Sequence, residues 1–463
     1  MASQGASGGG FGGVAKVIFA AHDHAGPVGG DVMRRAVLPS SAVLCGVALI
    51  GGAALVAGPS FGAEPPPVPA ASDDPADARV VEYRGLRVRV PAGWEVHDLD
   101  RDPSRCIRYD RHAVYLGRPG PQPDCPARLV GRTEAVHLQP AAEDGRAART
   151  TVPASRLATL KIPASTDHEA RLTLPDAGVA VTGVYGTDPA LLQRVLRDAE
   201  PNPDWKPGPD TQAPPEPNAR RGGPGPVDTV LSPLLDEPWA RGKGFDTCTA
   251  PSLAAMRAWR PSFKVTNIYI GGAARGCAQP NLTGEWVDEV REMGYRITPT
   301  YVGLQAPCGS RPQRFTAKNA ASQGAKSAVD AARKAEVLGI PEGAPIYYDM
   351  EAYKSKKRGC KAAVLRFVDN WVQKLEELGY EPCLYSSASS GIRDVGRADG
   401  ISKPTAIWFA HWNGKADVYG DSLVPDDWWR PHRRIKQYRG GHKEKHGGVT
   451  LNIDRNMVDG RVY

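Results

Sequence analysis

Four acidic residues stand near the ends of short strand patterns, where their carboxyl groups could take part in acid–base chemistry. They are Asp246, Asp349, Glu351 and Asp454. Residues two apart on a strand share a face, so Asp349 and Glu351 both point into a barrel or both point out of it. Pointing out would bury two carboxylates without partners, which is costly, so we expect both to point in.

Carboxyl groups gathered in this way cannot all ionise, so at least one pKa should rise. A neutral carboxyl beside an ionised one is the pair that cleaves glycosidic bonds, because one group donates a proton while the other stabilises positive charge. The alternative is that these acids bind a cation or cap loops.

The elements that must position the acids alternate between strand and helix patterns from about residue 231 to the C-terminus. Helical patterns follow at least the first four of eight strand patterns and weaken after the fifth. This alternation predicts an α/β fold, an irregular (β/α)8 TIM-like barrel over 231–463, with its chemistry at the C-terminal ends of the strands. The strand patterns cover 244–248, 267–272, 296–303, 345–353, 381–387, 406–412, 435–439 and 452–456, and the helical patterns cover 252–259, 283–294, 316–338 and 362–378.

The region before the barrel divides by composition. Residues 79–200 predict a small mostly-β module in which we find no chemical motif. Residues 201–230 predict a Pro/Gly-rich linker, because 201–226 alone hold nine prolines and four glycines. Residues 64–78 form a Pro/Ala tether. Within the module, strand patterns cover 86–90 and 179–185, and a helical pattern covers 189–199.

Residues 1–63 predict a leader and export signal. Met33 is the natural start, because Arg34-Arg35 opens a positive region and no charge follows between Ala36 and Ala63. The two arginines also resemble the twin-arginine export pattern. An uncleaved anchor is the alternative, since a stretch of this length could span a bilayer. We expect cleavage, no stable membrane span afterwards, and a secreted or envelope-associated protein.

The charge balance excludes one class of partner. Lys and Arg number 58 against 51 Asp and Glu, a net charge of +7 over 463 residues, and no long Lys/Arg run is present. We therefore expect no nucleic-acid partner.

Short motifs in the barrel region together carry a family resemblance. They are Gly244-Phe245-Asp246, Tyr269-Ile270-Gly271-Gly272, Tyr347-Tyr348-Asp349-Met350-Glu351, Leu384-Tyr385-Ser386-Ser387, Trp408-Phe409-Ala410-His411-Trp412, Gln437-Tyr438 and Ile453-Asp454-Arg455-Asn456. In this order they resemble the domain-of-unknown-function family 1906, glycoside-hydrolase-like barrels of exported actinobacterial proteins. They are more distantly similar to glycoside hydrolase family 25, the muramidases that cut peptidoglycan.

The resemblance implies a role for each acid. Glu351 is expected to be the general acid. Asp349 would orient the 2-acetamido group of the substrate or stabilise the developing oxocarbenium ion. Asp246 and Asp454 would complete an acidic floor.

Aromatic side chains near the strand ends are candidates for stacking on sugar rings. For each of them, ordinary barrel core is the alternative. The expected substrate-binding residues are Tyr269, Tyr301, Tyr347, Tyr385, Trp408, Trp412, Gln437 and Tyr438.

Seven cysteines follow the signal, and none forms a CxxC motif. Cys106 and Cys125 can pair locally. The other candidates fall just after strands or in the loops that follow, so we predict Cys248–Cys277 and Cys308–Cys360, because neighbouring loops can meet the short separation that a disulfide requires. Cys383 remains, as a buried free thiol.

Two basic segments, 354–358 and 439–446, are interpreted as loops near the same face that could attract an anionic wall polymer. Solvated loops are the alternative. We assign no metal, although His442 and His446 stand four apart, and no cofactor.

Two functions therefore remain open. The first is an exported glycoside hydrolase-like protein, with muramidase-like hydrolysis of peptidoglycan or a related amino-sugar polymer. The second is a catalytically inactive barrel that binds glycan and serves in envelope organisation. In either case we expect a monomer whose partner is a cell-wall glycan.

Overall fold

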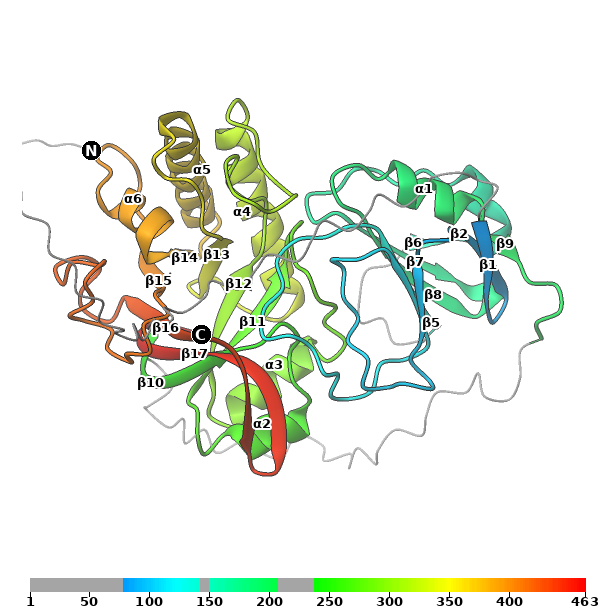
Figure 1. Ribbon diagram of the computed structural model, residues 1–463, viewed down its shortest axis with the longest axis horizontal. Coiled ribbons are helices and arrows are strands. Elements are labelled where there is room, and N and C mark those ends of the chain that lie inside the picture. Colours follow the sequence, from blue (N-terminus) through cyan, green and yellow to red (C-terminus); the bar gives the residue numbers. More distant parts are fainter. Residues whose placement is uncertain (1–77, 142–149, 207–236) are drawn as a thin grey trace, which may run out of the picture. The chain divides into compact units, whose positions relative to one another are not determined.

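The acids belong to a closed barrel of eight strands in a mixed α/β region (Figure 1). The computed structural model describes residues 78–141, 150–206 and 237–463. The expected leader (1–63), almost all of the tether (64–78) and most of the linker (201–230) lie outside the described residues. The barrel strands are β10 (Trp239–Asp246), β11 (Val265–Gly271), β12 (Arg296–Tyr301), β13 (Pro345–Met350), β14 (Glu381–Ser387), β15 (Ala406–Ala410), β16 (Arg434–His446) and β17 (Val449–Arg461).

The strand directions depart from a regular barrel at one place. Successive strands from β10 to β16 pair in parallel. Strand β17 closes the barrel and runs antiparallel to both β16 and β10. The expected eight-stranded barrel is therefore present, and its last strand enters from the opposite direction.

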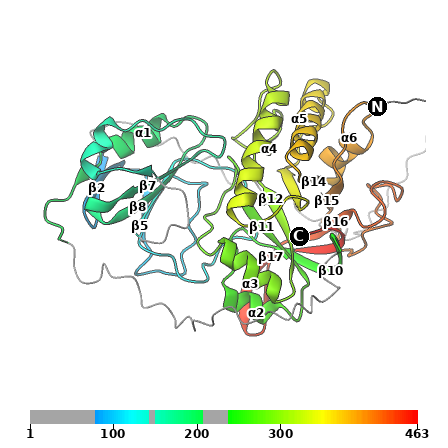
Figure 2. The same cartoon turned by 180° about the vertical axis from the view of Figure 1, so that it is seen from behind.

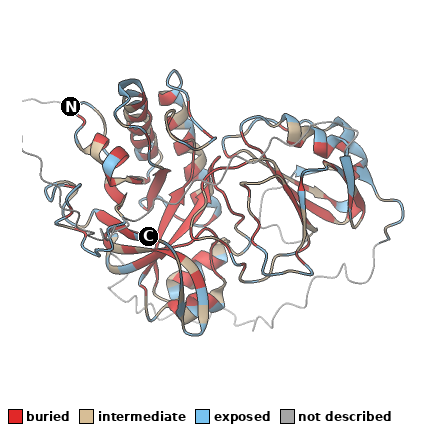
Figure 3. Cartoon of the chain, viewed as in Figure 1, coloured by how far each residue is buried: buried red, intermediate tan, exposed pale blue. Residues whose placement is uncertain are grey.

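The period of two along each strand separates an inner from an outer layer. On β13, Tyr347 packs inside with residues of the facing strands, while Tyr348 and Met350 pack outside against the helices. Asp349 consequently points inward, as predicted. Figure 3 shows that buried residues line the barrel strands.

Helices follow the first five barrel strands. Figure 2 shows α2 and α3 together and α4 beside α5. In α5 the buried side chains recur at helical spacing, from Val364 and Phe367 to Trp371 and Leu375, and Gly379 follows with φ +81°. The helices are α2 (Leu253–Trp259), α3 (Gly284–Glu292), α4 (Ala320–Val337), α5 (Arg358–Glu377) and α6 (Arg393–Gly396), with a π-helical turn at Ala388–Ile392. No helix among the described residues is both long and apolar enough to cross a membrane.

One interpreted loop is a strand. Residues 439–446, taken from their charge as a loop, continue β16, which pairs with β17 as far as His446 opposite Val449. A two-residue turn of Gly447 and Gly448, both with positive φ, closes this hairpin. Its charged side chains obscure the strand pattern because the hairpin extends beyond the barrel core.

The N-terminal module consists of two sheets and a helix. The expected strands at 86–90 and 179–185 are β2 and β8, and the expected helix is α1. Residues up to 206 remain attached to it, because β9 pairs with β2 and Asn202 bonds to the 84–85 turn. One sheet has the order β1 (Ala78–Tyr83), β2 (Leu86–Pro91), β9 (Glu200–Pro201); the other is β3 (Glu95–Asp98), β4 (Ala113–Leu116), β5 (Ala135–Pro140), β8 (Val179–Val184), β7 (Glu169–Leu174), β6 (Thr150–Thr151), and α1 is Ala190–Arg197.

Pro69–Tyr463 forms one compact unit, and within it residues 123–133, here called the crossing segment, contact the barrel loops. Val130 bridges to Arg275, and the amide of Gly131 donates to the carbonyl of Ala274 over 2.8 Å. A Cβ at residue 276 would lie 2.6 Å from the carbonyl oxygen of Leu129, so glycine permits the close approach.

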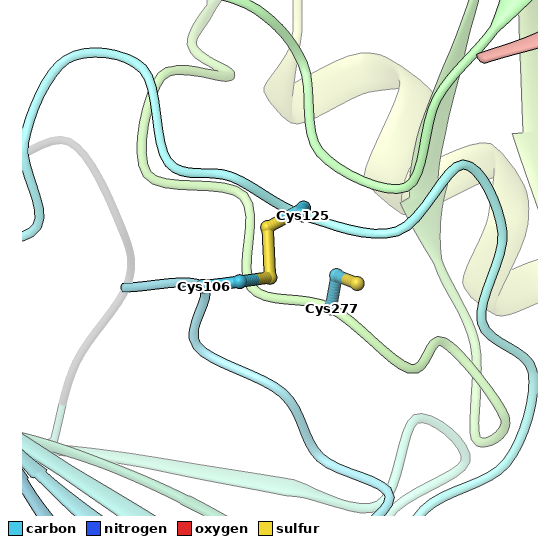
Figure 4. Close-up of side chains that lie close together, drawn as sticks. All are labelled: Cys106, Cys125 and Cys277. Carbon is cyan, nitrogen blue, oxygen red and sulfur yellow. A yellow bond between two sulfur atoms is a disulfide. The ribbon is translucent and has the colours of Figure 1, made fainter. Parts of the chain in front are cut away.

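Three disulfides secure these loops, as predicted. They are Cys106–Cys125, Cys248–Cys277 and Cys308–Cys360, and Cys383 is a buried free thiol. The first two pack against each other, and Figure 4 shows Cys277 beside the Cys106–Cys125 bond. The three sulfurs of Cys106, Cys125 and Cys277 lie within 4.8 Å of one another, but each is already in a disulfide and is no thiolate ligand. Structural disulfides of this kind indicate an oxidising compartment outside the cytoplasm.

Removing the Cys248–Cys277 bond should destabilise the fold. A C248S/C277S double variant should lose about 3 kcal/mol of unfolding free energy, because the bond closes a 29-residue loop in the unfolded chain. Denaturant unfolding of the oxidised proteins measures the difference. An unchanged midpoint and slope would show that the bond adds nothing to stability.

Candidate functional site

The four predicted acids meet at the ends of the parallel strands. Asp246 is the last residue of β10 and stands in register with Asp454 of β17. Asp349 on β13 stands beside Tyr385 of β14, and Glu351 follows β13 on the same face. Asp454 reaches this end although its strand is antiparallel, because β17 is long and passes the site at mid-strand. The predicted convergence is therefore present, but Asp454 lies in the middle of its strand, whereas the sequence pattern predicted a position near the strand end.

Gln437 connects the acids to the aromatic side chains around them. Its Nε2 donates to both oxygens of Asp246, over 3.2 and 3.0 Å, and to Oδ2 of Asp454 over 3.1 Å. Its Oε1 accepts from the Tyr385 hydroxyl over 3.0 Å and from Trp412 Nε1 over 2.9 Å. Both ends of the amide are thus committed to protein groups, so Gln437 holds the site together and is not free to bind substrate.

Asn456 supplies the second donor to Asp246. Its Nδ2 donates to Asp246 Oδ1 over 2.6 Å, and its Oδ1 accepts from Trp408 Nε1 over 2.9 Å. The Tyr269 hydroxyl adds a longer bond of 3.4 Å to Asp246 Oδ2. Asn456 was not among the predicted site residues, although it lies two positions after Asp454 and therefore on the same face.

Burial controls the protonation of the three aspartates. Their residues are at most 1% exposed. Burial raises the pKa of Asp246 to about 6, against the lowering effect of its amide donors. The pKa values of Asp349 and Asp454 lie well above the ordinary value, first because of burial and then because of the charges of Glu351 and Asp246, respectively. Among the described residues, Oδ1 of each of these two aspartates has no hydrogen-bond partner.

Glu351 differs from the aspartates in being partly exposed. Its side chain retains 11% of its surface, and Oε1 has no hydrogen-bond partner among the described residues. Gln305 fixes the local backbone, because its Oε1 accepts from the Glu351 amide and its Nε2 donates to the Asp349 carbonyl, each over 2.7 Å. This clamp explains why the Asp-x-Glu segment continues to face inward after β13 ends.

Two arginines that the sequence analysis did not identify flank Glu351. Arg128 Nη1 lies 3.7 Å from Oε1, and Arg311 Nη2 lies 3.4 Å from Oε2. Arg128 also donates to the Tyr385 hydroxyl over 3.0 Å, and its guanidinium lies 4.8 Å from the centre of the Trp412 ring. Arg128 comes from the crossing segment, which carries no motif and no periodic pattern, so no signal in the sequence placed it here.

The predicted aromatic residues separate into two groups. Tyr269, Tyr385, Trp408 and Trp412 surround the acids, and Trp412 alone of them is substantially exposed, at 51%. The structure does not bring the others to the acids: the Tyr301 hydroxyl donates to Asp330 on α4, that of Tyr347 to the Arg461 carbonyl, and Tyr438 lies next to Arg455.

The two basic segments, 354–358 and 439–446, differ in their position and in their contacts. Residues 354–358 follow β13 as expected. In the hairpin, Lys443 pairs with Asp124 over 3.0 Å, and Glu444 contacts His442, His446 and Arg455. Both histidines of the hairpin, His442 and His446, therefore contact the Glu444 carboxylate.

Residues 257–458 match the family model described as the Rv2525c-like, glycoside hydrolase-like domain. The C-terminal part of the chain is therefore similar to glycoside hydrolase-like domains, as its motifs predicted. The matched residues include Asp349, Glu351 and Asp454 and begin after Asp246.

Solved structures similar to this chain share little sequence with it. An uncharacterized B. stearothermophilus protein is 19% identical over 48% of this chain and 99% of its own, with a TM-score of 0.33. The Clostridium perfringens spore cortex lytic enzyme SleM is 16% identical over 43% of this chain and 62% of its own (TM-score 0.31). A muramidase from Acremonium alcalophilum is 14% identical over 48% and 94% (TM-score 0.30). No curated protein shows a significant match.

Removing the Gln437 amide should destabilise the barrel. Gln437→Leu should lower the free energy of unfolding by about 3 kcal/mol or more, because several buried polar groups lose a partner at about 1–3 kcal/mol each. Gln373→Leu on the exposed face of α5 is the matched control and should change it by less than about 0.5 kcal/mol. Equal losses in denaturant unfolding would contradict the bridging role.

Asp246 should make stability depend on pH. Between about pH 4 and 6 the unfolded chain releases this proton while the folded chain keeps it, so folding weakens as the pH rises through this window. The unfolding free energy of Asp246→Asn minus that of wild type should therefore increase by about 2 kcal/mol between pH 4 and 7, at 1.36 kcal/mol per pKa unit. Exposed Asp288→Asn is the control. A difference independent of pH would contradict the raised pKa.

Proposed function

We propose that this protein hydrolyses glycosidic bonds of peptidoglycan or a related amino-sugar polymer, with Glu351 as the general acid. The observation that carries the proposal is the exposure of Glu351 in front of three buried aspartates. Of the four converging acids, it is the one whose side chain retains surface, 11%. Its Oε1, although buried, has no hydrogen-bond partner among the described residues. Glu351 is therefore the group that can approach a glycosidic oxygen, as the sequence resemblance to muramidases implies.

The three buried aspartates would assist Glu351 in this role. Asp349 faces the same side as Glu351, which follows β13, and its pKa is raised first by burial and then by the charge of Glu351. It would orient the 2-acetamido group of the substrate or stabilise the oxocarbenium ion. Asp246 and Asp454, bridged by Gln437, would complete the floor. Trp412, exposed at the rim, offers an aromatic surface to a sugar ring.

We also propose that the barrel is an irregular (β/α)8 barrel and that the chain acts outside the cytoplasm. Helices follow five parallel strands, and the antiparallel β17 is the irregularity. Three disulfides support a secreted or cell-envelope location. Export through the predicted signal, by the twin-arginine route, remains part of the proposal.

A second candidate is a catalytically inactive barrel that binds glycan and organises the envelope. The ion pairs of Glu351 with Arg128 and Arg311 favour it, because a general acid must exchange a proton with substrate and these arginines occupy its surroundings. The same acids would then form hydrogen bonds to sugar hydroxyls.

The hydrolysis of purified cell wall separates the two. Glu351→Gln should lower the release of reducing ends by at least about 100-fold, the usual range for loss of a general acid, while binding to the wall persists. Glu289→Gln, which alters an ion-paired glutamate on α3, is the matched control and should keep wild-type release. Background release by wild type and variant alike, with binding retained, would contradict hydrolysis and favour the inactive barrel.

A further inference from the structure

The crossing segment brings a positive charge to an acidic site that belongs to another part of the chain. It contacts three different parts of the barrel rim. Val130 bridges to Arg275, the backbone of Arg132 exchanges two hydrogen bonds of 2.8 Å with the Gln313 side chain, and Ala127 lies over Gly441 near Asp454. These backbone contacts hold residue 128 over the acids independently of its own side chain.

The Arg128 guanidinium is not saturated by protein partners. A guanidinium has five N–H donors, and among the described residues Arg128 makes one hydrogen bond, from Nη1 to the Tyr385 hydroxyl. Its distance of 3.7 Å to Glu351 exceeds the 2.7–2.9 Å of a charge-assisted hydrogen bond. The side chain retains 21% of its surface, so donors remain available to a ligand.

Arg311 flanks the other oxygen of Glu351. Its Nη2 donates a long hydrogen bond of 3.4 Å to Oε2, and its side chain is 34% exposed. Glu351 therefore stands between two partly free guanidinium groups. The single carboxylate of Glu351 cannot accept hydrogen bonds from all the N–H donors of two guanidinium groups. The remaining donors can therefore bind a second anionic group.

We propose that Arg128 and Arg311 bind a carboxylate carried by a sugar residue of the glycan, next to the bond that faces Glu351. The inference rests on the proposed function, because it takes this rim as the glycan-binding site. It names the substrate class as an amino-sugar strand that carries carboxylates, rather than a neutral strand. The planar fork of each guanidinium fits a carboxylate in bidentate fashion. Arg128 is thus a specificity residue supplied by the N-terminal part of the chain.

Binding to matched strands tests the proposal. The full-length Glu351→Gln protein, which should not cleave its ligand, is titrated with peptide-free glycan strands whose lactyl carboxylates are free and with the same strands after amidation. We expect about tenfold tighter binding to the free carboxylates, the effect of one charge-assisted pair. Strands that keep their peptide stems, with the lactyl carboxylate in amide linkage, should bind like the amidated ones if the sugar carboxylate is the group recognised.

Further variants assign the preference to the two arginines. Arg128→Gln and Arg311→Gln, each added to Glu351→Gln, should reduce the preference to within about twofold, and Arg128→Lys should retain part of it, because an ammonium lacks the fork. Arg257→Gln, which changes an exposed side chain on α2, is the matched control and should leave the preference unchanged. Thermal unfolding of each variant verifies the fold.

Several outcomes would overturn the inference. They are equal affinity for free and amidated strands, no binding to either, and a gain in affinity for both strands on Arg128→Gln, which would show that Arg128 blocks the site. Failure of the proposed hydrolysis is distinguishable from these. A wild type that releases no reducing ends, while the Glu351→Gln protein still prefers free carboxylates, refutes hydrolysis and leaves this inference standing.

Discussion

The burial of three carboxyl groups at one end of the barrel is the constraint on which the rest of the site depends. Each aspartate is an inward residue of a strand, so the fold that gathers them also removes them from water. Neutral donors meet part of this cost: the amides of Gln437 and Asn456 donate to Asp246, and Gln437 also donates to Asp454. Neutral donors leave the carboxyl pKa raised, whereas a buried cation would have kept the groups ionised.

This choice of donors divides the site into an inner and an outer layer. The inner layer consists of the three aspartates, whose pKa values burial raises, and of side chains whose polar atoms mostly bond to one another. The outer layer is charged, with Glu351 between Arg128 and Arg311 and with the exposed ring of Trp412 beside them. A ligand contacts the outer layer first. The charge state of each buried aspartate affects the electrostatic potential at this outer layer.

The sequence predicted the inner layer better than the outer one, for a physical reason. Strand alternation is local, so Asp246, Asp349 and Asp454 could be assigned to one face from their neighbours alone. The same rule, applied to β12, would have excluded Tyr301, because Thr298 and Thr300 occupy the inward positions and bond to Asn267. The hairpin of β16 and β17 was missed because its charged residues face solvent on a two-stranded extension. Arg128 depends on contacts between residues more than a hundred positions apart, which no local pattern encodes.

The contribution of Arg128 also changes the interpretation of the N-terminal module, in which the sequence showed no chemical motif. The Cys106–Cys125 bond secures the start of the crossing segment and packs against the Cys248–Cys277 bond of the barrel. Backbone bonds to Ala274 and side-chain bonds to Gln313 hold its end. A segment that only linked the two regions would need none of these contacts at the rim. Their density indicates that the module positions a charged side chain at the acids, so that the outer layer of the site is complete only when both parts of the chain are present.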